Sequence, residues 1–176
     1  MENDEHHQIS ADEPDRGVDL EPNEQGLPRW CSCENCTITS SEIEAVCCND
    51  RPEIMELLPE PGHCVTHLDF FRQQLMSDDS LTYNRLILAS TIKSETARQQ
   101  YLSKEFTNRL KRHLAYRTYL IIVNNSCPLG RYNRVVIPRC VVSKIREKYP
   151  EVSDSLYTGF LDVQNNAAQS ASSTTE

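Results

Sequence analysis

Apolar residues recur every three or four positions through the middle of the chain, which is typical of amphipathic helices. This spacing predicts one helix over residues 66–76, capped by Thr66, and a second over residues 80–100, beginning at Ser80. The most regular pattern runs over residues 104–124 and predicts a third helix. Its expected inward face carries Phe106, Leu110, Leu114 and Ile121.

A polar break at residues 124–130 ends this pattern, and a short β-branched run at residues 134–137 then predicts an extended segment. Proline is favoured in the first turn of a helix, so Pro138 indicates a last helix over residues 138–149, which Pro150 ends. The pattern as a whole predicts a mainly α-helical domain with one short extended segment.

The two ends of the chain lack this periodicity. Residues 1–27 contain nine acidic residues, one basic residue (Arg16) and few large apolar side chains. Such a composition cannot bury enough apolar surface to offset the entropy cost of folding, so a disordered acidic tail is expected. Residues 164–176 consist largely of Asn, Gln, Ser, Ala and Thr and are expected to be disordered as well. The folded domain is therefore predicted over residues 28–163.

Charge is distributed unevenly along the chain, whose overall net charge is −8. Residues 104–148 contain eleven basic residues and two acidic ones, Glu105 and Glu147, which gives this segment a local net charge of +9. A basic segment of this kind favours an anionic partner. The alternative is that the acidic tail folds back over the basic segment and screens it.

The expected compartment decides how the eight cysteines are interpreted. The N-terminus is acidic where a secretion signal is basic, and the longest purely apolar run, residues 119–123, is too short to span a membrane. We therefore expect a cytoplasmic protein. In that reducing compartment clustered cysteines are typical metal ligands, whereas free buried thiols or disulfides are the alternative.

The spacing of the cysteines favours two metal ions. In the pattern Cys31-x-Cys33-x-x-Cys36, two thiols three residues apart can reach one tetrahedral ion. Cys47 and Cys48 are adjacent, so their side chains point in different directions and fit two ions side by side. Two tetrahedral zinc ions that share one bridging thiolate need seven sulfurs. The predicted ligands are Cys31, Cys33, Cys36, Cys47, Cys48, Cys64 and Cys140.

Two further side chains lie outside this predicted set. His63 is the natural spare ligand, and Cys127 is expected to take part only if Cys140 is misplaced. So many protein ligands leave no open position for water, and the zinc is therefore predicted to be structural and to contribute its binding free energy to folding. Seven thiolates and two Zn²⁺ ions carry a net charge of −3, which Arg29 or Arg139 would offset.

A second set of chemically informative side chains lies on the third predicted helix. Arg112, His113 and Tyr116 offer what a nucleotide needs, namely charge for phosphate, a flat surface for the base and donors for its edge. Further charge for phosphate would come from Lys144, Arg146 and Lys148. The alternative is a solvated basic face with Tyr116 in the core, and composition alone favours that alternative.

Several short motifs occur together in a fixed order. They are residues 29–36 (RWCSCENC), 47–48 (CC), 112–117 (RHLAYR), 136–140 (VIPRC), 145–150 (IREKYP) and 157–160 (YTGF). Over about residues 30–160 the chain resembles the cytoplasmic C-terminal ballast domain of the subtype-seven ATP-gated purinergic receptor. The transmembrane and extracellular parts of that receptor have no counterpart here, so a free-standing domain is expected, and no channel activity is implied.

The resemblance implies a dinuclear zinc site on the seven predicted cysteines and a site for a guanine nucleotide, GDP or GTP. The residues implied in nucleotide binding are Arg112, His113, Tyr116, Val135 and Ile137. Two positions depart from the family pattern. Glu151 stands where a basic residue is expected after Tyr-Pro, and Val141 stands where a second cysteine is expected. The first bears on nucleotide affinity, and the second leaves the seven sulfurs intact.

Three classes of function are compatible with these features. The leading hypothesis is a non-catalytic zinc-binding module that binds a guanine nucleotide. The alternative is an interaction module that uses the basic face of residues 104–148, with a protein partner of unknown identity or, less favoured, a nucleic acid. An enzyme ranks last, because the chain has neither a phosphate-binding GxxxxGK[ST] loop nor an HExxH motif.

Overall fold

The computed structural model describes residues 18–124 and 135–151 of the 176-residue chain. The α-helices of these residues are α1 (Pro52–Met55), α2 (Asp69–Leu75), α3 (Asp78–Ser90), α4 (Glu95–Ser103), α5 (Asn108–Val123) and α6 (Arg139–Lys148). Short 3₁₀ helices span Glu42–Glu44, Cys48–Asp50 and Val65–His67. Within the described ranges there is no strand beyond an isolated bridge between Pro22 and Pro28, which confirms the predicted mainly α-helical fold. None of the helices formed by these residues combines the length and apolar character that crossing a membrane requires.

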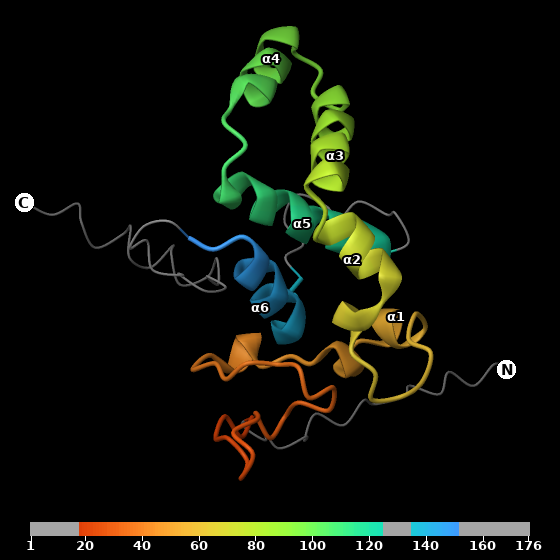
Figure 1. The fold of residues 1–176 in the computed structure, drawn as a ribbon, viewed down its shortest axis with the longest axis vertical. Coiled ribbons are helices and arrows are strands. Elements are labelled where there is room, and N and C mark those ends of the chain that lie inside the picture. Colours follow the sequence, from red (N-terminus) through yellow and green to blue (C-terminus); the bar gives the residue numbers. More distant parts are fainter. Residues whose placement is uncertain (1–17, 125–134, 152–176) are drawn as a thin grey trace, which may run out of the picture.

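Helix α5 is the element around which the other helices pack. It contacts α2, α3 and α6, and α6 in turn contacts the 3₁₀ helices Cys48–Asp50 and Val65–His67. In Figure 1, α3 and α4 stand at one end of the molecule and the cysteine-rich segment, residues 28–50, lies at the opposite end. This arrangement brings the cysteine-rich segment beside the beginning of α6.

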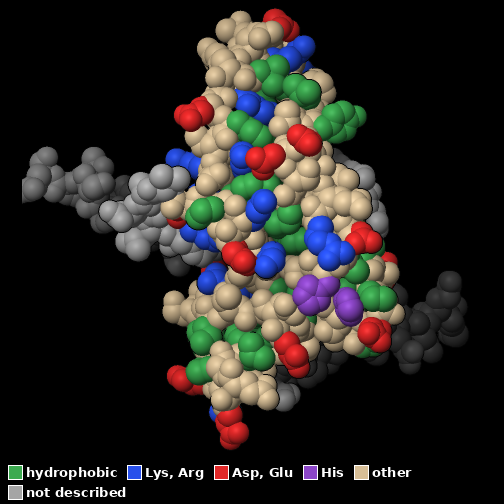
Figure 2. Space-filling model, in the orientation of Figure 1, with side chains coloured by type: hydrophobic (Ala, Val, Ile, Leu, Met, Phe, Trp, Pro, Cys, Tyr) green, Lys and Arg blue, Asp and Glu red, His purple; other side chains and the backbone are tan. Residues whose placement is uncertain are grey.

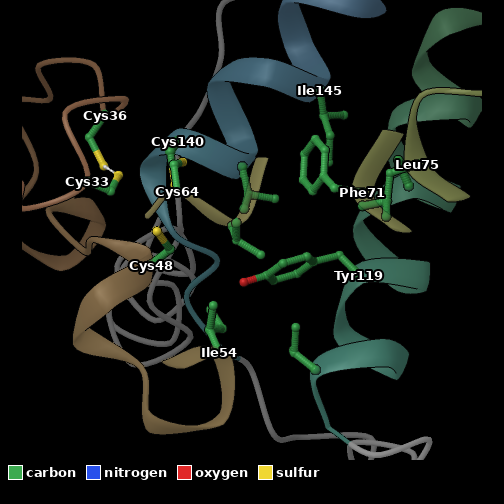
Figure 3. Close-up of a cluster of buried hydrophobic side chains, with 14 of the residues drawn as sticks. Cys33, Cys36, Cys48, Ile54, Cys64, Phe71, Leu75, Tyr119, Cys140 and Ile145 are labelled. Atoms are coloured by element: carbon green, nitrogen blue, oxygen red, sulfur yellow. Dashed lines mark hydrogen bonds between the residues drawn. The ribbon is translucent and has the colours of Figure 1, made fainter. Parts of the chain in front are cut away.

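One buried cluster joins the helices to the cysteines. Its largest members include Phe71 and Leu75 from α2, Leu114 and Tyr119 from α5 and Ile145 from α6. Six of the cysteines belong to the same cluster. Figure 3 shows the labelled cysteines on one side of the view and Phe71, Leu75 and Tyr119 together on the other. Because burying a large apolar side chain contributes about 1.5–3 kcal/mol, this shared core links the cysteines to the packing of the helices.

The predicted second helix is in fact two helices. Instead of continuing over residues 80–100, the chain breaks between α3 and α4, and Ser94 caps α4 by accepting a hydrogen bond from the backbone amide of Ala97 at 3.3 Å. Helix α3 likewise begins earlier than the predicted Ser80, because Ser77 caps it. Serine is a preferred capping residue because its hydroxyl accepts a hydrogen bond from a free backbone amide of the first turn. Ser77 and Ser94 therefore set the starts of α3 and α4.

Two predictions about single side chains are wrong. Ile121 is 38% exposed, because the face of α5 that meets the core runs through Tyr119 instead. Thr66 does not cap α2, which begins at Asp69; its hydroxyl lies 3.1 Å from the sulfur of Cys64.

Acidic residues from outside the segment offset part of the net charge of residues 104–148. Lys111 Nζ lies 2.6 Å from a carboxylate oxygen of Asp78. Lys144 pairs at 2.9 Å with Glu147, which the net charge of +9 already includes. Among the described residues of the segment, Arg112, Arg139 and Arg146 are also ion-paired. On the face shown in Figure 2, Lys and Arg side chains are interspersed with Asp and Glu. The net charge of the segment therefore overstates the positive field at this surface.

Some predicted features lie outside the described residues, among them Cys127, Arg134 and the boundary between residues 163 and 164. The predicted boundary at residues 27 and 28 stays a prediction. Just before it, the backbone amide of Leu27 donates a hydrogen bond to the side chain of Asn23 at 2.9 Å. Residues 135–137 run without regular structure into α6, in the place where an extended segment is expected.

Candidate metal centre

Seven cysteines from separate parts of the chain form two overlapping groups of four. The outer group is Cys31, Cys33, Cys36 and Cys47, and the inner group is Cys33, Cys48, Cys64 and Cys140. Within each group the four sulfur atoms all lie within 4.8 Å of one another, and Cys33 belongs to both groups. The seven are the cysteines predicted as ligands, and a sulfur common to two groups is what a bridging thiolate requires.

The distances between sulfurs fit ligands arranged around a common ion. The sulfur of Cys33 lies 3.8 Å from that of Cys31 and 3.9 Å from that of Cys36. In a tetrahedral site with zinc–sulfur bonds of about 2.3 Å, neighbouring sulfurs are about 3.8 Å apart. Disulfide-bonded sulfurs lie about 2.05 Å apart, and all seven cysteines are free thiols.

Local turns build the outer group. Glu34 has a φ of 58°, in the left-handed region that residues other than glycine rarely adopt. The side-chain amide of Asn35 donates to the backbone carbonyl of Cys33, which closes this turn between the two sulfurs of the CxxC pattern. At the other end of the group, the backbone amide of Cys47 donates to a carboxylate oxygen of Asp50 at 2.9 Å.

The inner group instead joins elements that are distant in the sequence. Cys48 begins a 3₁₀ helix, Cys64 immediately precedes another, and Cys140 is the second residue of α6. The backbone amide of Arg139 donates to the carbonyl of Val46 at 2.9 Å, which brings the start of α6 against the cysteine-rich segment. All four inner cysteines are buried, and Figure 3 shows Cys48, Cys64 and Cys140 converging from different ribbons.

The side chain of Arg139 reinforces this junction. It donates to the hydroxyl of Thr37 at 3.0 Å and forms an ion pair with Glu44 at 3.0 Å, and the Glu44 side chain is only 8% exposed. Arg29, the other cation expected to offset the charge of the cluster, is exposed and lies 3.7 Å from a carboxylate of Asp19. The contact of Arg139 therefore serves to join α6 to the cysteine-rich segment.

Two hydroxyl groups that the sequence did not connect with the cysteines lie beside two of the sulfurs. The hydroxyl of Ser32 is 3.6 Å from the sulfur of Cys47, and that of Thr66 is 3.1 Å from the sulfur of Cys64. Groups that hydrogen-bond to ligands orient them and tune their basicity. Ser32 lies between the predicted ligands Cys31 and Cys33, and Thr66 lies two residues after Cys64. This closeness in sequence is the only signal that could have pointed to these two hydroxyl groups.

Hydrogen bonds among the thiols shift their proton affinities in opposite directions. A hydrogen bond with Cys33 lowers the pKa of Cys47, whereas contact with Cys33 raises the pKa of Cys140. Sulfurs this close cannot all be ionised unless cations balance them. Thiolates bind metal only after losing their protons, so metal ions would replace the protons that the sulfurs share here.

The predicted spare ligand, His63, lies outside both groups. Its Nδ1 atom is 3.8 Å from a carboxylate oxygen of Glu60, and its ring makes an edge contact with His67 at a centroid distance of 5.7 Å. Cys127 lies outside the described residues. Within the described ranges, the cysteines themselves supply four sulfurs for each of two ions.

The residues implied in nucleotide binding occupy different environments. Arg112 is buried, and its guanidinium donates to the carbonyl of Tyr149 at 2.7 Å and to a carboxylate oxygen of Glu151 at 2.7 Å. His113 is exposed on the neighbouring position of α5, and Tyr116 is partly buried. Arg112 and Tyr116 thus lie one turn apart on a single helix, as predicted, but the guanidinium already has an anionic partner.

Val135 lies apart from these side chains. It lines a cavity of about 40 Å³ together with Glu53 and Leu120 at the C-terminal end of α5. Leu120 is about 12 Å along the helix axis from Arg112, given a rise of about 1.5 Å per residue. Ile137 is partly buried and packs against the core cluster. The structure therefore does not bring the five residues together around this cavity, which is much smaller than the roughly 300 Å³ of a typical ligand pocket.

A larger depression of about 330 Å³ lies beside the cysteine-rich segment. It is lined by Ser32, Asn49, Met55, Leu58, Pro59, Glu60, Pro61 and Gly62. None of the residues implied in nucleotide binding contributes to it.

The described residues define a class of protein: a small helical domain whose core contains cysteines placed to hold two metal ions. Residues 1–161 match the family model of the P2X purinoreceptor 7 intracellular domain, and the chain belongs to this family. The resemblance inferred from the short motifs is thereby confirmed. A comparison with curated proteins gave no match.

Proposed function

We propose that this chain is a non-catalytic, cytoplasmic module in which two zinc ions, bound by seven cysteines, fix the cysteine-rich segment to helix α6. The observation that carries the proposal is the pair of four-sulfur groups that share Cys33. Each group offers a complete tetrahedral set, which is the arrangement of structural zinc sites. The match to a receptor intracellular domain supports the cytoplasmic location.

The donor set favours zinc and a structural role. Four thiolates in a tetrahedral arrangement are typical of zinc or of iron–sulfur centres, and magnesium or calcium would require oxygen ligands. A catalytic zinc keeps one position open for water or substrate. Four cysteines for each ion leave no such position, so we infer that the metals contribute folding free energy and no chemistry.

Native mass spectrometry of the purified full chain, combined with elemental analysis, tests this proposal. We expect two zinc ions per chain and no bound iron. One ion, iron in place of zinc, or seven thiols that react freely with a thiol reagent in the folded protein would each contradict the two-zinc centre. An all-thiolate site protects its sulfurs from such reagents, so the thiol count provides a second measurement.

We further propose that the module binds a guanine nucleotide, GDP or GTP, through Arg112, His113 and Tyr116, with Val135 and Ile137 on the side of the base. Support comes from the family and from the concentration of cationic groups near Tyr116, which include Arg112 and Arg146. A guanidinium binds phosphate through paired donors, and a tyrosine ring can stack on a base.

Calorimetric titration of the zinc-loaded chain with GDP tests this second proposal. We expect saturable binding, and weaker binding in His113→Ala because the proposed contact of His113 with the nucleotide is lost. His113 is exposed, so its replacement should not disturb the core. The matched control is Lys93→Ala, which removes a cation between α3 and α4. A flat titration, or equal losses in both variants, would exclude a specific site around His113.

The alternative function, a protein- or nucleic-acid-interaction module using the basic face of residues 104–148, has weaker support. The ion pairs Lys111–Asp78 and Arg112–Glu151 involve acids from outside the segment and offset part of the charge that would attract a polyanion. This function predicts binding to polyanions that weakens steeply with salt and shows no preference for guanine. Binding to a duplex oligonucleotide at 50 and 200 mM salt would distinguish it from nucleotide recognition.

A further inference from the structure

A single carboxylate bridges the two arginines beside Tyr116. One oxygen of Glu151 accepts a hydrogen bond from Arg112 at 2.7 Å, and the other accepts one from Arg146 at 2.8 Å. The Arg112 side chain is only 6% exposed, whereas those of Glu151 and Arg146 are each 27% exposed. Two guanidiniums that converge on two oxygens of one anion form the arrangement that proteins also use to bind phosphate groups.

Backbone contacts hold this carboxylate in place. The side chain of Asn108 donates to the carbonyl of Pro150 at 2.9 Å, and Arg112 donates to the carbonyl of Tyr149 at 2.7 Å. These two hydrogen bonds fix the residues immediately before Glu151 against α5. A buried guanidinium needs an anionic partner, and here the chain itself supplies one.

We propose that Glu151 is the resident anion of an Arg112–Arg146 site and competes there with phosphate-bearing ligands, which lowers their affinity. This inference rests on the proposed nucleotide binding and specifies what controls it. The tethered carboxylate has a high effective concentration at the two guanidiniums, so a free phosphate group must displace it. Without it, a diphosphate could take the place of the carboxylate beside the guanidiniums of Arg112 and Arg146.

The magnitude of the effect follows from population arithmetic. If the carboxylate occupies the site in nine molecules of ten, the apparent affinity for a competing anion is reduced about tenfold. Replacing the carboxylate with an uncharged amide abolishes the competition while changing the size of the side chain little. Glu151→Gln should therefore bind inorganic pyrophosphate at least about tenfold more tightly than the unmodified chain.

The experiment measures pyrophosphate and GDP binding to the zinc-loaded full chain by calorimetry, together with thermal unfolding in the presence and absence of pyrophosphate. In Glu151→Gln we expect a lower unfolding temperature, because Arg112 has lost its anion, and recovery when pyrophosphate is added. The unmodified chain should show little change. Glu151→Asp, which retains a shorter carboxylate, should give an intermediate affinity and provides a second variant if the amide does not fold.

Two controls separate the site from general charge effects. Glu147 lies on α6, as Arg146 does, and forms an exposed ion pair with Lys144. Glu147→Gln removes this carboxylate and should leave the affinity for pyrophosphate unchanged. Adding Arg146→Gln to Glu151→Gln should remove the gain.

Equal pyrophosphate binding by Glu151→Gln and the unmodified chain would overturn the role of Glu151 but leave anion binding intact. Absence of binding in both would overturn nucleotide binding itself, and the gating role of Glu151 with it. An equal gain in Glu147→Gln would show that only overall charge matters and would also overturn the proposal.

Discussion

The outer and inner cysteine groups share one sulfur but depend on different parts of the fold. The outer group is assembled within residues 31–47 by short turns, including the left-handed residue Glu34. The inner group adds Cys64 and Cys140, which come from the approach to α2 and from the first turn of α6. One group therefore organises a local segment, and the other fixes tertiary structure.

Burial distinguishes the groups at one position, Cys31, because Cys36 and Cys47 of the outer group are only 4% and 0% exposed. Cys31 of the outer group is partly exposed, whereas the four inner cysteines are 0–3% exposed and continuous with the helical core. The lesson is that two sites with the same ligand chemistry should differ in their contribution to stability. A ligand set that closes a long loop and lies within the core has more structure depending on it than one that closes a turn.

Removal of both metals should have the largest effect. Apparent binding free energies of structural zinc are about 10–16 kcal/mol at neutral pH, so a strong chelator is expected to abolish cooperative thermal unfolding followed by circular dichroism. A zinc indicator dye should report release in two phases, with the outer ion leaving first. Release of both ions in a single phase would argue against the distinction between the groups.

Cys140→Ser should have the next largest effect on stability, because it removes a ligand that belongs only to the inner group. We expect loss of one zinc ion and destabilisation of more than about 4 kcal/mol in urea unfolding, the range associated with a lost metal site. Cys127→Ser is the control, because the predicted set of seven sulfurs does not need this eighth cysteine and two zinc ions should therefore stay bound. Loss of zinc in that control would assign Cys127 to the ligand set.

Cys31→Ser should be milder, since Cys31 contributes only to the outer group and is partly exposed. The chain should keep one zinc ion and a folded helical core, with a loss of about 1–3 kcal/mol. Metal content and urea unfolding, measured alongside Cys140→Ser, give the comparison directly. Equal destabilisation by the two substitutions would contradict the proposed difference.

Arg139→Gln tests the junction between α6 and the cysteine-rich segment without removing a ligand. It leaves the buried carboxylate of Glu44 without this ion pair, and hydrogen bonds to charged groups are worth about 1.5–3 kcal/mol. We expect a loss of about 2 kcal/mol, with both zinc ions retained. Arg29→Gln, at the exposed pair with Asp19, is the control and should change stability by less than about 0.5 kcal/mol.

Glu34→Gly should give the smallest change, in the stabilising direction. A left-handed conformation costs a non-glycine residue about 1–2 kcal/mol, and the greater freedom of glycine in the unfolded chain offsets about 0.5–1 kcal/mol of that. A net gain of up to about 1.5 kcal/mol is expected in urea unfolding. A loss of stability would show that the Glu34 side chain makes a contribution beyond its backbone conformation.

The sequence indicated the helical class and the seven cysteines because both depend on local chemistry. Helix periodicity needs only neighbouring residues, and the Cys33–Cys36 spacing needs only one turn. The common sulfur, Cys33, could not be identified in this way, because its position between the groups depends on how Cys64 and Cys140 approach it. Metal binding by these residues stays a prediction.

Errors arose where side chains compete with a simple pattern. Ser94 interrupts the helix expected over residues 80–100, because its hydroxyl offers the backbone a capping partner. Glu151 was recognised as a departure from the family pattern, but its ion pairs with Arg112 and Arg146 depend on the packing of α5 against α6. A contact between distant segments of this kind leaves no trace in the periodicity of either segment.

If two ions bind as proposed, the position of Cys33 in both groups would also give metal loading a direction. An ion in the inner group would hold Cys33 against the core and so place one outer ligand before the second ion arrives. An ion in the outer group alone would leave Cys64 and Cys140 to be gathered from distant parts of the chain. A chain made when zinc is scarce would then halt at a singly loaded stage, and the ratio of singly to doubly loaded molecules would record the zinc supply at the time of synthesis.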